Sequence, residues 1–164
     1  NQMETIHTPL TDEALENRIG EAVALFKSGY NCAQSVVAAF ADLYGFSREQ
    51  ALRMSASFGG GIGRMRQTCG AACGLFQLAG LDCGAVEAGD REGKSHNYAV
   101  VQDLAAAFKQ ENGSLICAEL LGLKAPEGSP QAEARTAGYY QKRPCAKMVE
   151  TAARIFADYL KQKH

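Results

Sequence analysis

The sequence lacks the features that mark membrane proteins and nucleic-acid-binding proteins. Its longest apolar runs, 22–26 and 36–41, are far shorter than the roughly 20 residues needed to cross a bilayer. Acidic and basic residues are interspersed and the formal net charge is −1, so there is neither a basic stripe nor an acidic tail. We therefore expect no membrane span and no nucleic-acid partner.

The first ten residues also lack the pattern of a signal peptide, in which a charged region precedes an apolar one. Cytoplasmic residence is the default expectation, which a leader removed earlier would overturn. A chain of 164 residues fits one compact domain with a sizeable core. We expect an N-terminal extension over 1–10 and one domain over 11–164.

Sustained strand alternation is absent, and apolar residues recur at helical spacing nearly throughout. The pattern predicts an all-α, single-domain bundle of about six to eight helices. Glycines end several of them, the loop 59–63 is too glycine-rich for a helix, and 123–143 is the least regular stretch. The predicted helix starts are the caps Thr11, Asn31, Ser47, Thr68 and Ser114, and Pro144 at the first position of the last helix. A longer helix is predicted over roughly 90–112.

The six cysteines include no Cys-x-x-Cys pair and no Cys-x-x-Cys-His haem site. Instead, four of them fall in the first turn of a predicted helix. Unpaired N–H groups and the positive end of the helix dipole favour an anion there, which predicts a lowered thiol pKa. We expect these four to be both the redox-active residues and the metal ligands: Cys69 first, with Cys32, Cys117 and Cys145.

The neighbours of Cys69 form a second group of candidates. Cys73 lies one turn further along the same helix face and could share a metal with it. Gly60, Gly61 and Gly70 would let a cofactor approach closely, although plain packing of the backbone explains glycine equally well. These four are the candidate cofactor-binding residues.

For four other residues the sequence does not indicate a definite role in the site. Arg64 and Arg66, beside the loop, would favour a thiolate or bind a small anion, unless they are simply solvated. Cys83 reads as an incidental thiol, and His96 as a surface or packing residue, and neither is assigned a role.

Four segments carry a resemblance to a known family. Residues 69–74 read CGAACG after the loop FGGGIGR at 58–64, and GYNCAQ at 29–34, CAELLG at 117–122 and PCAKMV at 144–149 surround the other three cysteines. The chain resembles the C_GCAxxG_C_C family, whose redox role is itself inferred from its cysteines. The resemblance implies that the family's four cysteines correspond to Cys32, Cys69, Cys117 and Cys145. The family also resembles a region of split-Soret cytochromes, but without a haem motif no haem site is carried over to this chain.

Three functions stay open at this point. The first is a redox protein whose four cysteines hold an iron–sulfur cluster or another thiolate-bound metal, for electron transfer or metal handling. The second is a metal-free thiol-disulfide oxidoreductase, and the third is a non-catalytic helical module with structural cysteines. The sequence does not decide whether the protein is an enzyme, which cofactor or electron or thiol partner it uses, or whether it forms a homo-oligomer.

Overall fold

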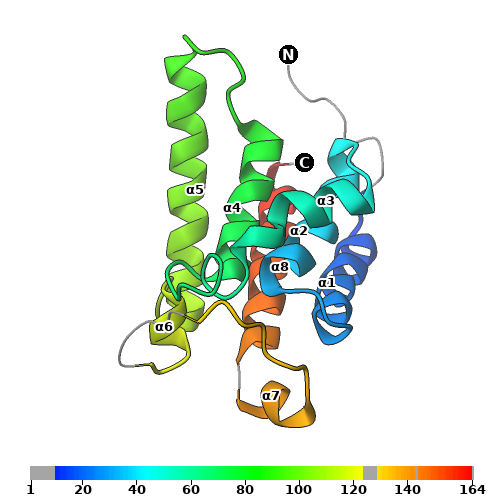
Figure 1. The fold of residues 1–164 in the computed structure, drawn as a ribbon. Coiled ribbons are helices and arrows are strands. Elements are labelled where there is room, and N and C mark those ends of the chain that lie inside the picture. The colour runs from blue at the N-terminus through cyan, green and yellow to red at the C-terminus, as the bar shows by residue number, and fades with distance from the viewer. Residues whose placement is uncertain (1–9, 124–128, 143, 164) are drawn as a thin grey trace.

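The structure, a computed structural model, describes residues 10–123, 129–142 and 144–163 (Figure 1). The described residues contain no strand, which confirms the predicted all-α fold. The predicted extension over 1–10 lies almost wholly outside them. In chain order the elements are α1 (Asp12–Lys27), α2 (Cys32–Ala38), the 3-10 helix η1 (Ala41–Tyr44), α3 (Arg48–Ser55), the 3-10 helix η2 (Ala56–Phe58), α4 (Gly70–Cys83), α5 (Arg91–Asn112), α6 (Cys117–Leu120), α7 (Ala137–Lys142) and α8 (Cys145–Lys163).

Four helix starts are capped by a side chain, and three of these caps, Thr11, Asn31 and Ser47, are as the sequence predicts. Thr11, Asn31, Ser47 and Asp90 each accept a hydrogen bond from the backbone N–H three residues further on. At Asn31 and Ser47 a glutamine side chain also bonds back to the cap's own N–H, which completes a capping box. Each cap accepts a hydrogen bond from a backbone N–H that the first turn of a helix leaves unpaired. Local side chains alone therefore set where these four helices begin.

Two of the predicted caps are wrong. Thr68 forms an isolated antiparallel bridge with Ile116, and Cys69 takes the N-cap position of α4. Ser114 is not the cap of α6, because Ile116 occupies that position and donates its N–H to the Ser114 hydroxyl at 2.9 Å. Both errors have one cause, the pairing of two chain segments that are distant in sequence.

Other boundaries shift by a few residues. The helix predicted from Asn31 onward is interrupted, and its remainder, η1, ends at Gly45 with φ +85°. At the interruption Phe40 packs edge-on against Phe156, with ring centroids 5.1 Å apart. Helix α4 runs to Cys83, past the glycine at 80, and α8 begins at Cys145, one residue after the predicted first position at Pro144.

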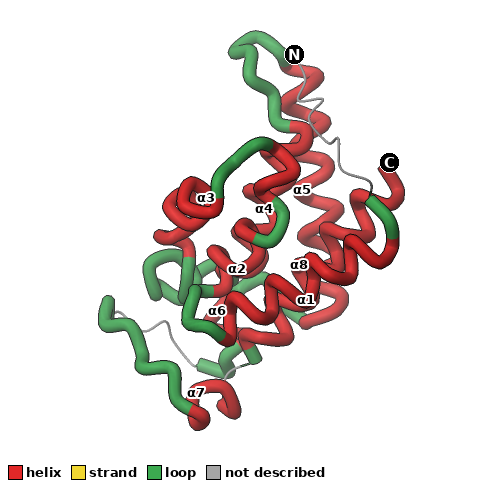
Figure 2. The backbone as a smooth tube through the Cα atoms, turned by 90° about the vertical axis from the view of Figure 1, so that its right-hand side faces the viewer, coloured by secondary structure: helices red, strands yellow, loops and turns green. Residues whose placement is uncertain are grey.

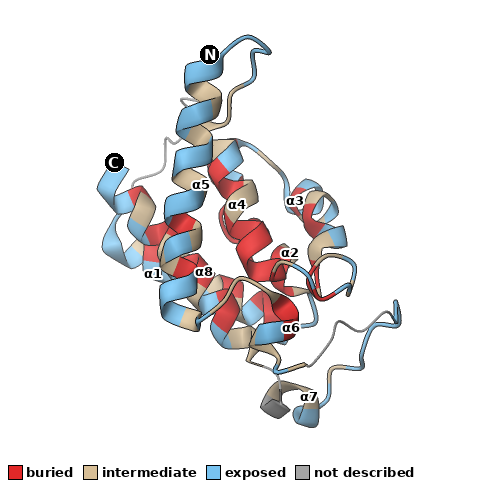
Figure 3. Cartoon of the chain, turned by 90° about the vertical axis from the view of Figure 1, so that its left-hand side faces the viewer, coloured by how far each residue is buried: buried red, intermediate tan, exposed pale blue. Residues whose placement is uncertain are grey.

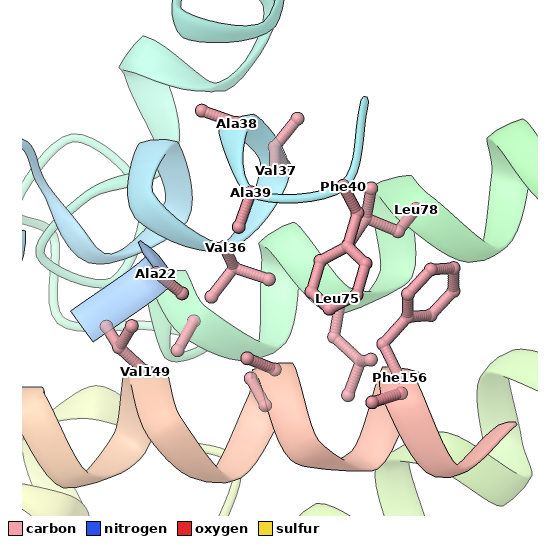
Figure 4. Packing of buried hydrophobic residues seen from close by; sticks show 14 of the residues in the cluster. Ala22, Val36, Val37, Ala38, Ala39, Phe40, Leu75, Leu78, Val149 and Phe156 are labelled. Carbon is pink, nitrogen blue, oxygen red and sulfur yellow. The ribbon is translucent and has the colours of Figure 1, made fainter. Parts of the chain in front are cut away.

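The core lies between α4 and α8, with α1 and α2 packed on one side and α5 on the other. Buried residues follow the facing sides of these helices (Figure 3). Val36 of α2, Leu75 of α4 and Phe156 of α8 all point into the core (Figure 4). Helix α5 buries fully only Leu104 and Phe108, and its two valines at 100 and 101 are half-buried.

This packing gathers several helix starts at one end of the molecule. Helices α4 and α8 both begin at the lower end in Figure 1, where α6 and α7 also lie. The loop that leads into α7 runs along the same end (Figure 2). None of the described helices has the length and the apolar character needed to cross a bilayer.

Candidate functional site

A cavity of about 570 Å³ occupies the end of the bundle where α2, α4, α6 and α8 begin. The glycine-rich loop and the segment 129–142 complete its wall. The four predicted cysteines, which are far apart in the sequence, all line this cavity. Each lies at a helix start: Cys32 is the first residue of α2, Cys69 the N-cap of α4, Cys117 the first residue of α6 and Cys145 the first of α8.

The glycine-rich loop carries an unusual backbone into the cavity wall. Left-handed φ angles are expected of glycine, but here non-glycine residues adopt them too, at a cost of about 1 kcal/mol or more each. The surrounding structure holds this conformation, for example through the Gly63 N–H, which donates to the Ser57 carbonyl at 2.7 Å. The left-handed residues are Gly60, Gly61, Ile62, Gly63, Arg64 and Arg66, with φ between 57° and 73°.

Two of the candidate glycines let cysteines approach closely. A Cβ on Gly70 would lie 2.5 Å from the Cys32 sulfur and 2.7 Å from the Phe58 carbonyl oxygen. A Cβ on Gly61 would lie 2.6 Å from the Cys117 Cβ. Gly60 and Gly70 line the cavity itself, whereas Gly61 lies outside its lining.

The isolated bridge ties two of the cysteines together. On either side of the Thr68–Ile116 pair, the Cys69 N–H donates to the Leu115 carbonyl at 2.7 Å and the Cys117 N–H to the Gln67 carbonyl at 2.6 Å. The starts of α4 and α6 are therefore fixed to each other by backbone bonds.

Burial is the largest influence on the pKa of two of the thiols, Cys32 and Cys69. It raises the pKa of Cys32, against hydrogen bonds from the Gly60 and Ala33 backbone, and the charge of Cys117 raises it further. It also raises the pKa of Cys69 well above the ordinary value; the charge of Cys32 adds to this and the Ala71 and Ala72 backbone N–H groups oppose it. The predicted lowering of the thiol pKa is therefore wrong for Cys32 and Cys69. The loss of hydration raises the pKa by more than the backbone N–H groups of the helix start lower it.

Arginines form the charged part of the wall. Arg66 is buried, at 5% exposure, and its Nη1 lies 3.7 Å from the Cys117 sulfur. Arg64 donates to the carbonyls of Ser129, at 3.0 Å, and Gln131. The expectation that the loop arginines are solvated is thus wrong for Arg66, whose side chain belongs to the site.

Arg135 is a wall residue that was not among the sequence-based candidates. Its guanidinium stacks on Phe26 at 4.4 Å and on Tyr139 at 4.9 Å, and it donates to the Phe26 and Tyr30 carbonyls at 2.9 Å each. These contacts fasten the segment 129–142 across the end of α1. The adjacent tyrosines at 139 and 140 were the only local hint of such stacking.

The other candidates lie outside the cavity wall. Cys73 is buried, and its pKa is raised to about 11 by burial and by the charge of Cys32. Cys83 ends α4 on the far side of the bundle, and His96 is exposed on α5. All six cysteines are thiols outside any disulfide. Within the described ranges, no three His, Cys, Asp or Glu side chains are already close enough to hold a metal ion.

The comparison with protein families fits this geometry. The family model described as "Putative redox-active protein (C_GCAxxG_C_C)" matches residues 30–159, which include all four cavity cysteines. The chain belongs to this family. Neither the curated proteins nor the solved structures contain a match to the chain.

Proposed function

We propose that this redox-family protein holds a thiolate-bound metal or an iron–sulfur cluster in the cavity and uses it for electron transfer or metal handling. The observation that carries the proposal is the convergence of four cysteines, from four helix starts, on one cavity. The proposed ligands are Cys32, Cys69, Cys117 and Cys145.

The chemistry of the wall supports such a centre. Thiolates are the ligands that iron–sulfur clusters and soft metals prefer, and a bound metal deprotonates a coordinating thiol that burial keeps neutral. Backbone N–H groups reach the sulfurs of Cys32 and Cys69, and the Arg66 guanidinium reaches that of Cys117. Hydrogen bonds of this kind orient thiolate ligands and tune the potential of a cluster.

A bound centre would supply a one-electron couple or a metal-storage site. The residues of this chain would supply the thiolate ligands and the hydrogen bonds to their sulfurs. Because the sulfurs are not yet gathered within the described ranges, binding must draw them closer. The backbone stays close to these residues, since a Cβ on Gly70 would lie 2.5 Å from the Cys32 sulfur and one on Gly61 would lie 2.6 Å from the Cys117 Cβ.

Anaerobic purification followed by metal and sulfide analysis and a visible spectrum tests the proposal. We expect a coloured or metal-containing protein, and a loss of metal content of at least about tenfold in Cys69→Ser. The matched control is Cys83→Ser, at the opposite end of the same helix, which should keep the full content. A metal-free wild-type protein that takes up neither iron and sulfide nor zinc would contradict the proposal.

A metal-free thiol-disulfide couple is the second candidate. It is supported by the shared cavity, which Cys32, Cys69 and Cys117 line as free, buried thiols. Two of the thiols would lose two electrons and two protons to a partner disulfide, which is reduced to two thiols while the new bridge forms. Redox titration of the metal-free protein, with the bridge mapped by mass spectrometry, tests this. If neither a metal nor a couple is found, the helical-module interpretation is left.

A further inference from the structure

The backbone of the glycine-rich loop lies directly against the start of α2. The Gly60 N–H donates to the sulfur of Cys32, the first residue of that helix. A Cβ on the preceding residue, Gly59, would lie 2.5 Å from the side chain of Asn31, which caps the helix. The loop is therefore in close contact with the segment that carries this cysteine.

The continuation of the same loop is bonded to the start of α6. The Arg66 carbonyl accepts the Ala118 N–H at 3.2 Å, and the Arg66 N–H donates to the Gly60 carbonyl at 3.1 Å. One residue further on, the Gln67 carbonyl accepts the N–H of the cysteine that begins α6, at 2.6 Å. The segment 59–67 therefore connects the backbone beside one cavity cysteine with the backbone beside another.

This segment keeps a costly backbone conformation. Three of its residues other than glycine, Ile62, Arg64 and Arg66, have left-handed φ angles between 61° and 68°. Such angles persist only where the surrounding structure enforces them, and they are concentrated at functional sites. The bonds that Arg66 makes to the loop and to α6 enforce its angle, which fixes the direction in which its side chain leaves the backbone.

From this backbone the Arg66 side chain reaches the Cys117 sulfur. Its Nη1 lies 3.7 Å from that sulfur, and both residues are buried, at 5% and 8% exposure. A guanidinium group can only donate, so the sulfur is the acceptor. Hydrogen bonds from a charged donor are strong, and they are strengthened further where water is excluded. The contact is therefore suited to fixing the orientation of a Cys117 thiolate.

We propose that the segment 59–67 is the positioning element of the metal centre, and that Arg66 orients the Cys117 sulfur as a ligand. The inference rests on the proposed function, since it assigns Arg66 a role toward a bound metal. Arg66 is thus a positioning residue, which acts on the metal only through the sulfur of Cys117. This role depends on the contact between the guanidinium and the sulfur, whatever else Arg66 binds.

The first test is the zinc affinity of the reduced full-length protein, measured by competition with a chelator. Arg66→Gln should weaken zinc binding by at least about tenfold, the usual loss when a group that orients a metal ligand is removed. Arg66→Lys keeps the charge and should keep part of the affinity. The matched control is Arg53→Gln, at an exposed arginine of α3 that pairs with Glu49, and it should have no effect.

A double-mutant cycle shows whether Arg66 acts through Cys117. In a Cys117→Ala background the sulfur is absent, so Arg66→Gln should change the zinc affinity by less than about twofold. In a Cys69→Ala background the sulfur of Cys117 remains, and Arg66→Gln should still weaken binding by about tenfold. A loss that merely reflects poorer folding would be the same in both backgrounds.

Two substitutes keep the test decisive. If urea unfolding of the metal-free protein shows that Arg66→Gln does not fold, Arg66→Gly takes its place, because glycine adopts a left-handed φ of 61° without strain. If the wild type takes up iron and sulfide but no zinc, the fraction of iron retained against EDTA replaces the zinc affinity.

The outcomes separate this inference from the proposed function. The inference alone is overturned if the wild type binds metal and the Arg66 variant binds it as tightly. It is also overturned alone if the variant loses the same affinity in both cysteine backgrounds. A wild type that takes up no metal overturns the proposed function as well.

Discussion

The two ends of α4 differ in whether their polar side chains have hydrogen-bond partners within the protein. At its N-terminal end, Cys69 faces a cavity together with three other cysteines. At its C-terminal end, the Asp82 side chain is 3% exposed and accepts hydrogen bonds from Tyr44 at 2.8 Å, Tyr159 at 2.6 Å and Lys163 at 2.6 Å. One end satisfies its polar groups internally, and the other presents them to a space that a ligand can fill.

The pKa directions at the two ends follow from this difference. Burial alone would raise the pKa of Asp82, but hydrogen bonds from Lys163, Tyr159 and Tyr44 outweigh it, and the pKa is lowered. At Cys69 the same burial outweighs the backbone bonds, and the pKa is raised. The negative charge of the Asp82 carboxylate is therefore already stabilised by its neighbours, whereas a thiolate at Cys69 requires a partner such as a metal.

The largest expected effect on stability is at Gly70. Gly70→Ala would place a Cβ against the Cys32 sulfur and the Phe58 carbonyl, so the packing must shift, at a cost of about 2 to 3 kcal/mol in the free energy of unfolding. Gly80→Ala, near the other end of the same helix, meets nothing within 4 Å and should stabilise by up to about 1 kcal/mol. Urea unfolding of both variants measures the contrast, and equal effects would contradict the close approach at Gly70.

A smaller effect is expected at Asp82. Asp82→Asn weakens three hydrogen bonds to a buried carboxylate and should cost about 2 kcal/mol. The control Asp42→Asn, whose carboxylate is 60% exposed in its pair with Arg18, should stay within about 1 kcal/mol. Denaturant unfolding at neutral pH compares the two.

The pH dependence of Asp82→Asn sharpens this test. Because the folded pKa of Asp82 lies below its ordinary value of 3.8, its carboxylate contributes fully to stability above that value. The contribution is lost as the pH falls below 3.8 through the folded pKa. The stability difference between wild type and Asp82→Asn should therefore shrink in that range, and a difference that grows there would contradict the assignment.

The smallest expected effect on stability is at Arg135. Arg135→Gln removes the stacking on Phe26 and Tyr139 and should cost about 1 kcal/mol. It should also loosen the segment over the cavity, so that Cys145 is alkylated several-fold faster while Cys83 at the other end of the bundle is unaffected. Peptide mass spectrometry after a short alkylation pulse reads both. Unchanged labelling of Cys145 would show that this segment does not control access.

Much of the fold could be predicted because its signals are local. The predicted caps at Thr11, Asn31 and Ser47 depend on side chains three residues from the groups that they bond. Thr68 and Ser114 carry the same signal but do not cap. Long-range pairing of their segments replaces the local bond, and a sequence window contains no trace of that pairing.

The site divides in the same way. The sequence by itself determined that Cys32 and Cys145 stand at helix starts, because the Asn31 cap and the position of Pro144 are encoded within a few residues. Cys69 and Cys117 also stand at helix starts as predicted, but the pairing of their segments sets those starts and the local caps do not. Only the tertiary structure decided that these starts meet at one cavity, that burial raises the pKa of Cys32 and Cys69, and that Arg66 lies inside beside Cys117. Burial and convergence depend on how distant helices pack, and the loss of hydration that follows outweighs the local effect of a helix start.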